Sequence, residues 1–298
     1  MKFAAIDIGS NAIRLLLMNV FESDEGPVYR KDALYRVALR LGEESFLDKK
    51  ISPKKSAKFV DTMKAFRILM DVHDVKHFKA CATAAMREAE NGHELIERVK
   101  EEAEIDIEIV TGKEEAEIIY GNNIVEYLNP EKNYLYIDVG GGSTELSLFH
   151  KKRLIDSCSF PIGTLKILNN QVEDAHWEEM NNWISPFLKK HKNISGIGSG
   201  GNINKLYKLY GDTKNGFIRK EELMCALEDL TGSTFYERIK SMGLRPDRAD
   251  VIIPAVEIFL QLSDWANIKL VYVPKFGVSD GLIHLVYQEY KNGQKAMK

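Results

Sequence analysis

Two short stretches of the sequence combine an acidic residue, a glycine turn and hydroxyl side chains. They read DIGSN (7–11) and DVGGGSTE (138–145). Backbone N–H groups in glycine turns form concave sites for anions, and serine hydroxyls can donate to phosphate oxygens. A lone glycine triplet would also suit a hairpin turn, but the pattern occurs twice. It therefore predicts two phosphate-binding turns, whose candidate residues are Gly9, Ser10, Asn11, Gly140, Gly141, Gly142 and Ser143.

The acidic residues of these stretches indicate a cation. Asp7 and Asp138 would repel a phosphate directly, whereas Mg²⁺ is commonly held by one or two carboxylates together with substrate phosphates and waters. Glu145 can add a second carboxylate to the metal. At the equivalent position of the first stretch stands Arg14, which can offer a guanidinium to phosphate. We therefore expect Asp7, Asp138 and Glu145 to serve a metal.

The two stretches belong to an internal repeat. AAIDIGSNAIRLLLM (4–18) aligns without a gap on LYIDVGGGSTELSLF (135–149), at an offset of 131 residues. Each segment reads as a strand, a tight glycine turn and a second strand, because its apolar runs are short and flanked by turn residues.

The same elements follow in both halves. They are a third strand (28–39 and 153–160), a helix (52–72 and 174–190) and a further short strand (78–83 and 194–199). The repeat predicts two related α/β domains, each with a mixed sheet and covering helices. We expect them to span residues 1–124 and 125–298.

A third loop, GIGSGGN (196–202), precedes a predicted helix (203–210). Helix N-termini favour anions, so Gly198, Ser199 and Gly200 are further phosphate-binding candidates. The usual P-loop is absent from the sequence, and the dinucleotide fingerprint does not fit this loop.

Composition excludes several classes of function. The net charge of −3 gives no global signature of nucleic-acid or membrane binding, and no apolar run approaches the roughly 18 residues of a membrane span. The three cysteines fit free thiols in a reducing cytosol. We expect a cytoplasmic protein with no DNA or membrane partner. A homodimer stays open, since dimers are the commonest oligomers.

Six motifs in order carry a family resemblance: AAIDIGSNAIRLL, ATAAMREA (82–89), TGKEEAEIIYG (111–121), YIDVGGGSTEL, GIGSGGNI and GLRPDRADVIIPA (243–255). Together they resemble the exopolyphosphatase/guanosine pentaphosphate phosphohydrolase (Ppx/GppA) family over nearly the whole chain. This family belongs to the actin, sugar-kinase and chaperone-ATPase superfamily. The resemblance implies an α/β fold of two actin-like (ribonuclease H-like) domains, each with a mixed β-sheet flanked by helices, around an interdomain cleft.

The resemblance also implies an activity, namely release of a terminal phosphoryl group from polyphosphate or the guanosine pentaphosphate pppGpp, with Mg²⁺. The family's catalytic glutamate falls on Glu115, which would orient and partly deprotonate a water. Its arginine of the AAMREA segment falls on Arg87, expected to clamp a phosphate. The family's metal-associated acids fall on Asp138 and Glu145.

Two departures and two alternatives accompany this interpretation. The first turn has Ala12 where the family often has serine, and the segment after Gly281 lacks the family's usual charged pair. An ATP-dependent kinase, or an actin-like or chaperone-like ATPase, could use the same fold.

Overall fold

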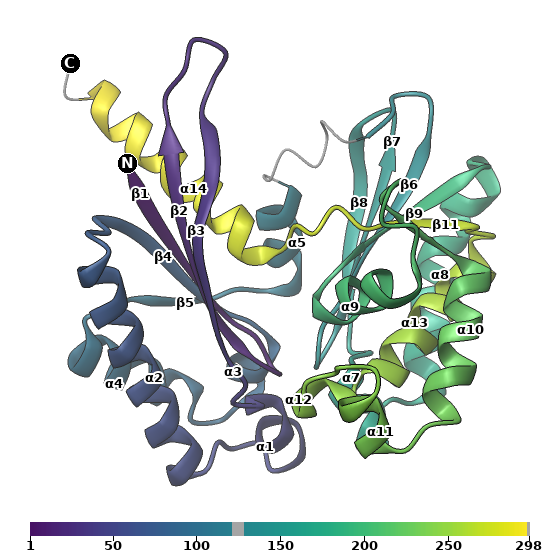
Figure 1. Ribbon diagram of the computed structural model, residues 1–298, viewed down its shortest axis with the longest axis horizontal. Helices are drawn as coiled ribbons and strands as arrows, with labels where there is room; N and C mark the ends of the chain where they lie inside the picture. Colours follow the sequence, from purple (N-terminus) through teal and green to yellow (C-terminus); the bar gives the residue numbers. More distant parts are fainter. Residues whose placement is uncertain (121–127, 297–298) are drawn as a thin grey trace. The chain divides into compact units, whose positions relative to one another are not determined.

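The computed structural model describes residues 1–120 and 128–296, which divide into two compact units (Figure 1). Unit 1 is Met1–Asn122 together with Gly277–Lys298, and unit 2 is Asn123–Phe276. Each unit contains one mixed β-sheet and the helices that cover it.

The sheet of unit 1 has the strand order β3-β2-β1-β4-β5. Strand β1 is antiparallel to β2 and parallel to β4. The strands are β1 (Lys2–Ile8), β2 (Ile13–Phe21), β3 (Val28–Val37), β4 (His77–Ala82) and β5 (Ile107–Ile109). The helices are α1 (Leu41–Leu47), α2 (Pro53–Val72), α3 (Ala84–Glu88), α4 (Gly92–Ala103), α5 (Gly112–Tyr120) and α14 (Val278–Ala296).

The sheet of unit 2 has the order β10-β11-β9-β6-β7-β8, in which β6 again pairs antiparallel with β7 and parallel with β9. Its strands are β6 (Asn133–Val139), β7 (Thr144–His150), β8 (Arg153–Phe160), β9 (Ile194–Ser199), β10 (Phe217–Arg219) and β11 (Leu270–Tyr272). Its helices are α7 (Thr164–Leu168), α8 (Asp174–Lys190), α9 (Gly201–Tyr210), α10 (Lys220–Thr231), α11 (Phe235–Lys240), α12 (Pro246–Ala249) and α13 (Ile252–Trp265).

The internal repeat is confirmed down to local backbone detail. The first turn is closed by a hydrogen bond from Gly9 N to Ala12 O (3.2 Å), and the second by one from Gly140 N to Ser143 O (2.9 Å). The register shifts directly after Leu17 in β2 and directly after Leu148 in β7. Both pairs of positions differ by the 131 residues of the sequence alignment, so the two α/β units have the predicted common design.

Burial explains why these segments form sheets. The central strands β1 and β6 are buried at every position after the first, because both faces of each sheet are covered. The outer strands β3 and β8 consist instead of exposed and half-buried residues, with Phe160 as the one buried position of the two strands. None of the helices in the described residues combines the length and the apolar character that crossing a lipid bilayer requires.

The C-terminal segment differs from the expected division at residues 124 and 125. That boundary itself lies outside the described residues, but helix α14, expected in the second domain, packs against β1, β4 and α5 of unit 1. The physical reason is its apolar face, since Leu282, Ile283 and Val286 are buried. The GLRPDRADVIIPA motif (243–255) spans α12 and the start of α13.

Candidate active site

A row of four polar side chains crosses the sheet of unit 2. In the strand registers Asp138 pairs with Glu145 on one side and with Ser199 on the other, and Glu145 pairs with Ser159. The Ser199 hydroxyl lies 3.2 Å from Asp138 Oδ2. Glu145 Oε1 accepts hydrogen bonds from Ser159 (2.9 Å) and from Ser143 of the turn (2.5 Å).

The two carboxyl groups of this row are adjacent and shielded from water. Asp138 is 8% exposed and Glu145 is 2% exposed. Directly opposed residues of an antiparallel pair have Cβ atoms roughly 4.5–5.5 Å apart, so the two side chains share one face at one end of the sheet. Among the described residues no group of three or more histidine, cysteine or acidic side chains could hold a metal. A pair of carboxylates nevertheless suits Mg²⁺, which takes its remaining ligands from phosphates and waters.

The equivalent row of unit 1 carries a different charge. Asp7 pairs in register with Arg14 and with Cys81. Arg14 Nη1 donates to Asp7 Oδ2 at 2.5 Å, and the Asp7 side chain is 5% exposed. In unit 1 the carboxylate at the end of the first strand therefore contacts a guanidinium, where unit 2 has a second carboxyl group.

Glu114 and Glu115 both lie on the first turn of α5, and they have different surroundings. Glu114 caps the helix, because its carboxylate accepts from Thr111 N (2.7 Å) and Thr111 Oγ1 (2.9 Å). These bonds lower the pKa of Glu114. Glu115, in contrast, is buried, with 9% of the residue exposed. Burial raises the pKa of the Cys81 thiol well above its ordinary value, and the charges of Asp7 and Glu115 add to this rise. Glu115 is thus a buried acid of unit 1 whose charge acts on Cys81, the strand neighbour of Asp7.

Arg87 joins two segments of unit 1. It lies on α3, and its Nη1 donates to the carbonyl oxygen of Val110 at 2.6 Å. Val110 follows β5 and precedes the helix of Glu115. Arg87 thereby fixes the segment that leads into α5.

Both glycine turns accept backbone hydrogen bonds from the start of a short helix. In unit 1 the backbone N–H of Gly42 donates to Ser10 O (2.9 Å), and that of Arg40 donates to Asn11 O (3.0 Å). In unit 2 the bonds are donated from α7: Leu165 N reaches Gly141 O (2.9 Å), at the position equivalent to Ser10, and Thr164 N reaches Gly140 O (3.0 Å). Gly141 and Gly142, expected to offer open backbone to phosphate, are buried.

The third loop contacts the second row directly. Gly200 has φ 101°, and a Cβ there would lie 3.1 Å from Asp138 Oδ1. Ser199 bonds Asp138, as described above, whereas a Cβ on Gly198 would meet the core side chains of Ile203, Val271 and Phe259. The loop therefore brings Ser199 and Gly200 to the carboxylates, and Gly198 serves helix packing.

Sequence reasoning missed the residues that support these groups. Ser159 reaches Glu145 through strand pairing, and only the period of β8 could have indicated it. Gly163, before α7, would with a Cβ meet backbone atoms of Gly141 and Gly142. The sequence feature that could have indicated Gly163 is its position between the third predicted strand and the start of a helix.

Two sheets of common design, each with a glycine turn and a row of charged side chains at one end, define a duplicated α/β protein. A family model described as the Ppx/GppA phosphatase family matches residues 28–289. The chain belongs to this family.

Two relatives and a solved structure accord with this family assignment. The chain is 27% identical to a bifunctional 3-dehydroquinate synthase/phosphatase of Fusobacterium nucleatum, over 97% of the chain but only 46% of that protein. It is 24% identical to a putative exopolyphosphatase of Haemophilus influenzae, over 99% of the chain and 93% of the relative. The crystal structure of an exopolyphosphatase from Cytophaga hutchinsonii has the same fold, with TM-score 0.81, 23% identity and 98% coverage of both chains.

Proposed function

We propose that this protein is a Mg²⁺-dependent phosphohydrolase that releases terminal orthophosphate from inorganic polyphosphate or pppGpp. Membership of a phosphatase family supports the hydrolase class. The name of the Haemophilus relative supports polyphosphate as substrate, and the family resemblance adds pppGpp.

One observation carries the proposed role of Glu115. The residue is only 9% exposed, and its charge acts on Cys81, the strand neighbour of Asp7. Exposed helix glutamates face bulk water, as Glu114 and Glu117 do on this helix. A buried carboxylate is the kind of group that can orient a water and accept its proton.

Hydrolysis of a phosphoanhydride mainly requires positioning and charge neutralisation. In the proposed reaction, water attacks the terminal phosphorus and the shortened phosphate chain leaves, while Glu115 takes the proton of the water. Arg87 and Arg14 are proposed to neutralise phosphate oxygens, and the two glycine turns to bind them through backbone N–H groups.

The carboxyl pair of unit 2 fits the proposed metal. Asp138 and Glu145 would hold Mg²⁺ together with substrate phosphates, and the ion would supply charge neutralisation. Asp7 is proposed as a further metal-facing acid, although its contact with Arg14 also suits a role in orienting that guanidinium. Chelation of divalent ions should abolish phosphate release. Glu145→Gln should increase the Mg²⁺ concentration needed for half-maximal rate.

Glu115→Gln tests the proposed base. Phosphate release from medium-chain polyphosphate and from pppGpp should fall by about 10²–10⁴-fold, the usual contribution of a general base. Glu117→Gln is the matched control, because it changes an exposed glutamate of the same helix and should leave the rate unchanged. Full activity in Glu115→Gln would show that the assigned base is wrong.

The same assays separate the competing activities. A kinase would turn over ATP faster when an acceptor is added. An actin-like or chaperone-like ATPase would bind ATP tightly and hydrolyse it slowly. Comparing kcat/KM for several polyphosphate lengths with that for pppGpp identifies the preferred substrate.

A further inference from the structure

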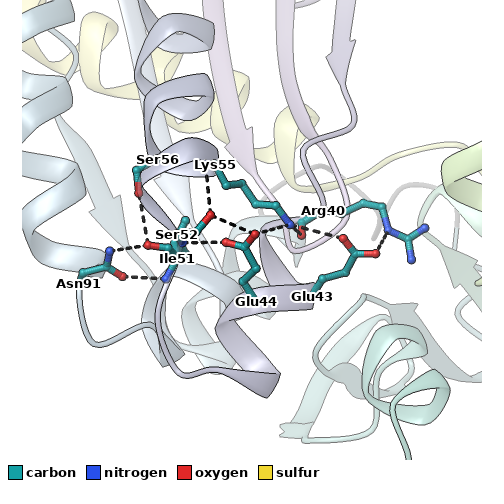
Figure 2. Close-up of polar contacts among 8 residues, drawn as sticks. All are labelled: Arg40, Glu43, Glu44, Ile51, Ser52, Lys55, Ser56 and Asn91. Atoms are coloured by element: carbon teal, nitrogen blue, oxygen red, sulfur yellow. Dashed lines mark hydrogen bonds and ion pairs between the residues drawn. The ribbon is translucent and has the colours of Figure 1, made fainter.

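A polar network joins the start of α2 to the short helix α1, which donates hydrogen bonds to the first glycine turn (Figure 2). Its central group is the ammonium of Lys55, whose side chain is only 16% exposed. Lys55 Nζ donates to the carbonyl oxygen of Arg40 at 2.9 Å. It also lies 3.4 Å from Glu43 Oε2 and 3.5 Å from Glu44 Oε1, and Figure 2 shows it between these two carboxylates. One lysine of α2 therefore holds both the backbone and the side chains of α1.

The position of this ammonium is set by the N-terminus of α2 as well as by charge. Glu44 also accepts from Ser52 N at 2.7 Å and from Ser52 Oγ at 3.1 Å. Ser52 is the N-cap residue of α2, and its Oγ accepts from Lys55 N at 3.3 Å. Burial opposes ionisation of Glu44, but the bonds from Ser52 and the charge of Lys55 outweigh it and lower the pKa of Glu44. Lys55 is thus part of an ionised set with a fixed geometry.

The residue whose carbonyl Lys55 holds has a strained backbone. Arg40, the N-cap residue of α1, has φ 49° and ψ 50°, in the left-handed region. N-cap residues normally have extended backbone, as Gly163 has before the equivalent helix α7 (φ −132°, ψ 158°). Residues other than glycine keep the left-handed region only where their surroundings impose it. The bond from Lys55 is such a constraint, because a change of ψ to extended values would rotate the carbonyl away from the ammonium.

This conformation of Arg40 orients the peptide groups of the first glycine turn. Arg40 N donates to Asn11 O at 3.0 Å, and the next bond runs from Gly42 N to Ser10 O at 2.9 Å. In a trans peptide group the carbonyl oxygen and the N–H of the next residue point in opposite directions. The N–H of Ala12, which shares a peptide group with Asn11 O, therefore points away from α1. The direction of the N–H groups in the turn depends on how α1 is held.

We propose that Lys55 is a positioning residue of the phosphate site of unit 1. It keeps Arg40 left-handed and thereby fixes the direction of the N–H groups that the Gly9–Asn11 turn offers to phosphate. This inference rests on the proposed function, in which the turn binds phosphate through its backbone. It adds a residue that acts on the site through α1 and contacts no substrate.

A double-mutant cycle of Lys55→Met and Arg40→Gly tests this role, because glycine adopts the left-handed backbone without strain. The measurement is the Kd for tripolyphosphate with Mg²⁺ in the Glu115→Gln background, where turnover should be slow. Lys55→Met should raise this Kd about 10-fold, which corresponds to about 1.4 kcal/mol. When residue 40 is glycine, the same substitution should raise it by less than about twofold, because the two effects are coupled. Lys58→Met, which changes an exposed lysine of the same helix, is the matched control and should leave Kd unchanged.

The cycle separates positioning from a loss of stability. Lys55→Met removes the same ion pairs with Glu43 and Glu44 in both backgrounds, so Tm should fall by a similar amount in both. Affinity should fall only where residue 40 is arginine. Hydrogen exchange supplies a second measurement without substrate, since the amide proton of Gly42 should exchange faster in Lys55→Met and at the parental rate in the double variant.

The outcomes distinguish this inference from the proposed function. An unchanged Kd in Lys55→Met, or an equal rise of Kd in both backgrounds, overturns the inference. A rise of Kd confined to the background with arginine at residue 40 supports it. A wild-type chain that releases no phosphate, although tripolyphosphate binding shows this coupling, would contradict the proposed hydrolysis and leave the role of Lys55 supported. Absence of tripolyphosphate binding before any change at residue 55 would contradict both.

Discussion

The substitution Gly281→Ala tests whether α14 positions the proposed base. Gly281 is where α14 meets α5, the helix of Glu115. A Cβ at residue 281 would lie 2.8 Å from the carbonyl carbon of Ile118, 2.7 Å from its Cγ2 and closer still to its carbonyl oxygen. Ordinary contact begins at 3.4 Å. The carbonyl belongs to the helix backbone, so a rotamer change cannot relieve the overlap and α5 must move.

The size of the effect follows from this overlap. Bringing the carbonyl carbon to ordinary contact requires 0.6 Å, and the oxygen requires more, so α5 should shift by about 1 Å. A misplacement of about 1 Å can reduce a rate by roughly 10²-fold. Overpacking of this kind typically costs about 1–3 kcal/mol of unfolding free energy. We therefore expect a hundredfold lower kcat in a protein that still folds.

Phosphate release and thermal unfolding measure both effects. Gly293→Ala is the control on the same helix, where a Cβ meets nothing within 4 Å and alanine should stabilise by about 0.5–1 kcal/mol. If Gly281→Ala acts through Glu115, it should slow the Glu115→Gln protein little, because coupled substitutions are not additive. An equal reduction in both backgrounds would refute the reasoning.

Three further predictions concern the turn of unit 2, the thiols and the pH dependence of stability. In Gly163→Ala the Cβ would lie 2.5 Å from the carbonyl carbon of Gly141, so α7 should separate from the turn, with lower Tm and weaker tripolyphosphate binding; parental values would refute this packing argument. At pH 8 a thiol reagent should label exposed Cys225 first and buried Cys81 only after unfolding, and rapid native labelling of Cys81 would contradict its raised pKa. Burial raises the pKa of Asp280, although the charges of Lys31 and Arg14 oppose this rise. The folded state therefore binds the carboxyl proton of Asp280 more tightly than the unfolded state does. The free energy of unfolding should fall as pH rises from 3.8 through the raised pKa. Urea unfolding of both proteins between pH 3.5 and 7 should show a smaller fall in the free energy of unfolding for Asp280→Asn than for the parent protein.

The sequence was sufficient for the repeated hairpins because their information is local. A glycine turn between two short apolar runs specifies a β-hairpin whatever surrounds it, and the 131-residue offset gave the equivalent residues Asp7 and Asp138 directly. The following elements were also predictable, since α2 and α8 begin and end within a residue of the expected ranges.

Long-range contacts were not predictable in the same way. The placement of α14 depends on an apolar face and on one glycine that admits Ile118 O, and neither feature names its partner in the sequence. The segment from Arg40 to Glu44 reads in the sequence as ordinary surface charge. The hydrogen bonds that Arg40 N and Gly42 N donate to the first turn depend on backbone positions, which residue types do not encode.

The repeat also shows how one backbone can serve two purposes. Each turn has the same closing hydrogen bond and a short helix that donates to it, so the backbone of the two units is alike at this place. The side chains at equivalent positions differ: Arg14 balances the charge of Asp7, whereas Glu145 adds a second carboxyl group to Asp138. A cation is therefore expected at the row of unit 2, because two adjacent carboxylates disfavour each other without one. In unit 1 the acid of the row, Asp7, already contacts the guanidinium of Arg14, and we therefore propose Glu115 rather than Asp7 for the proton transfer.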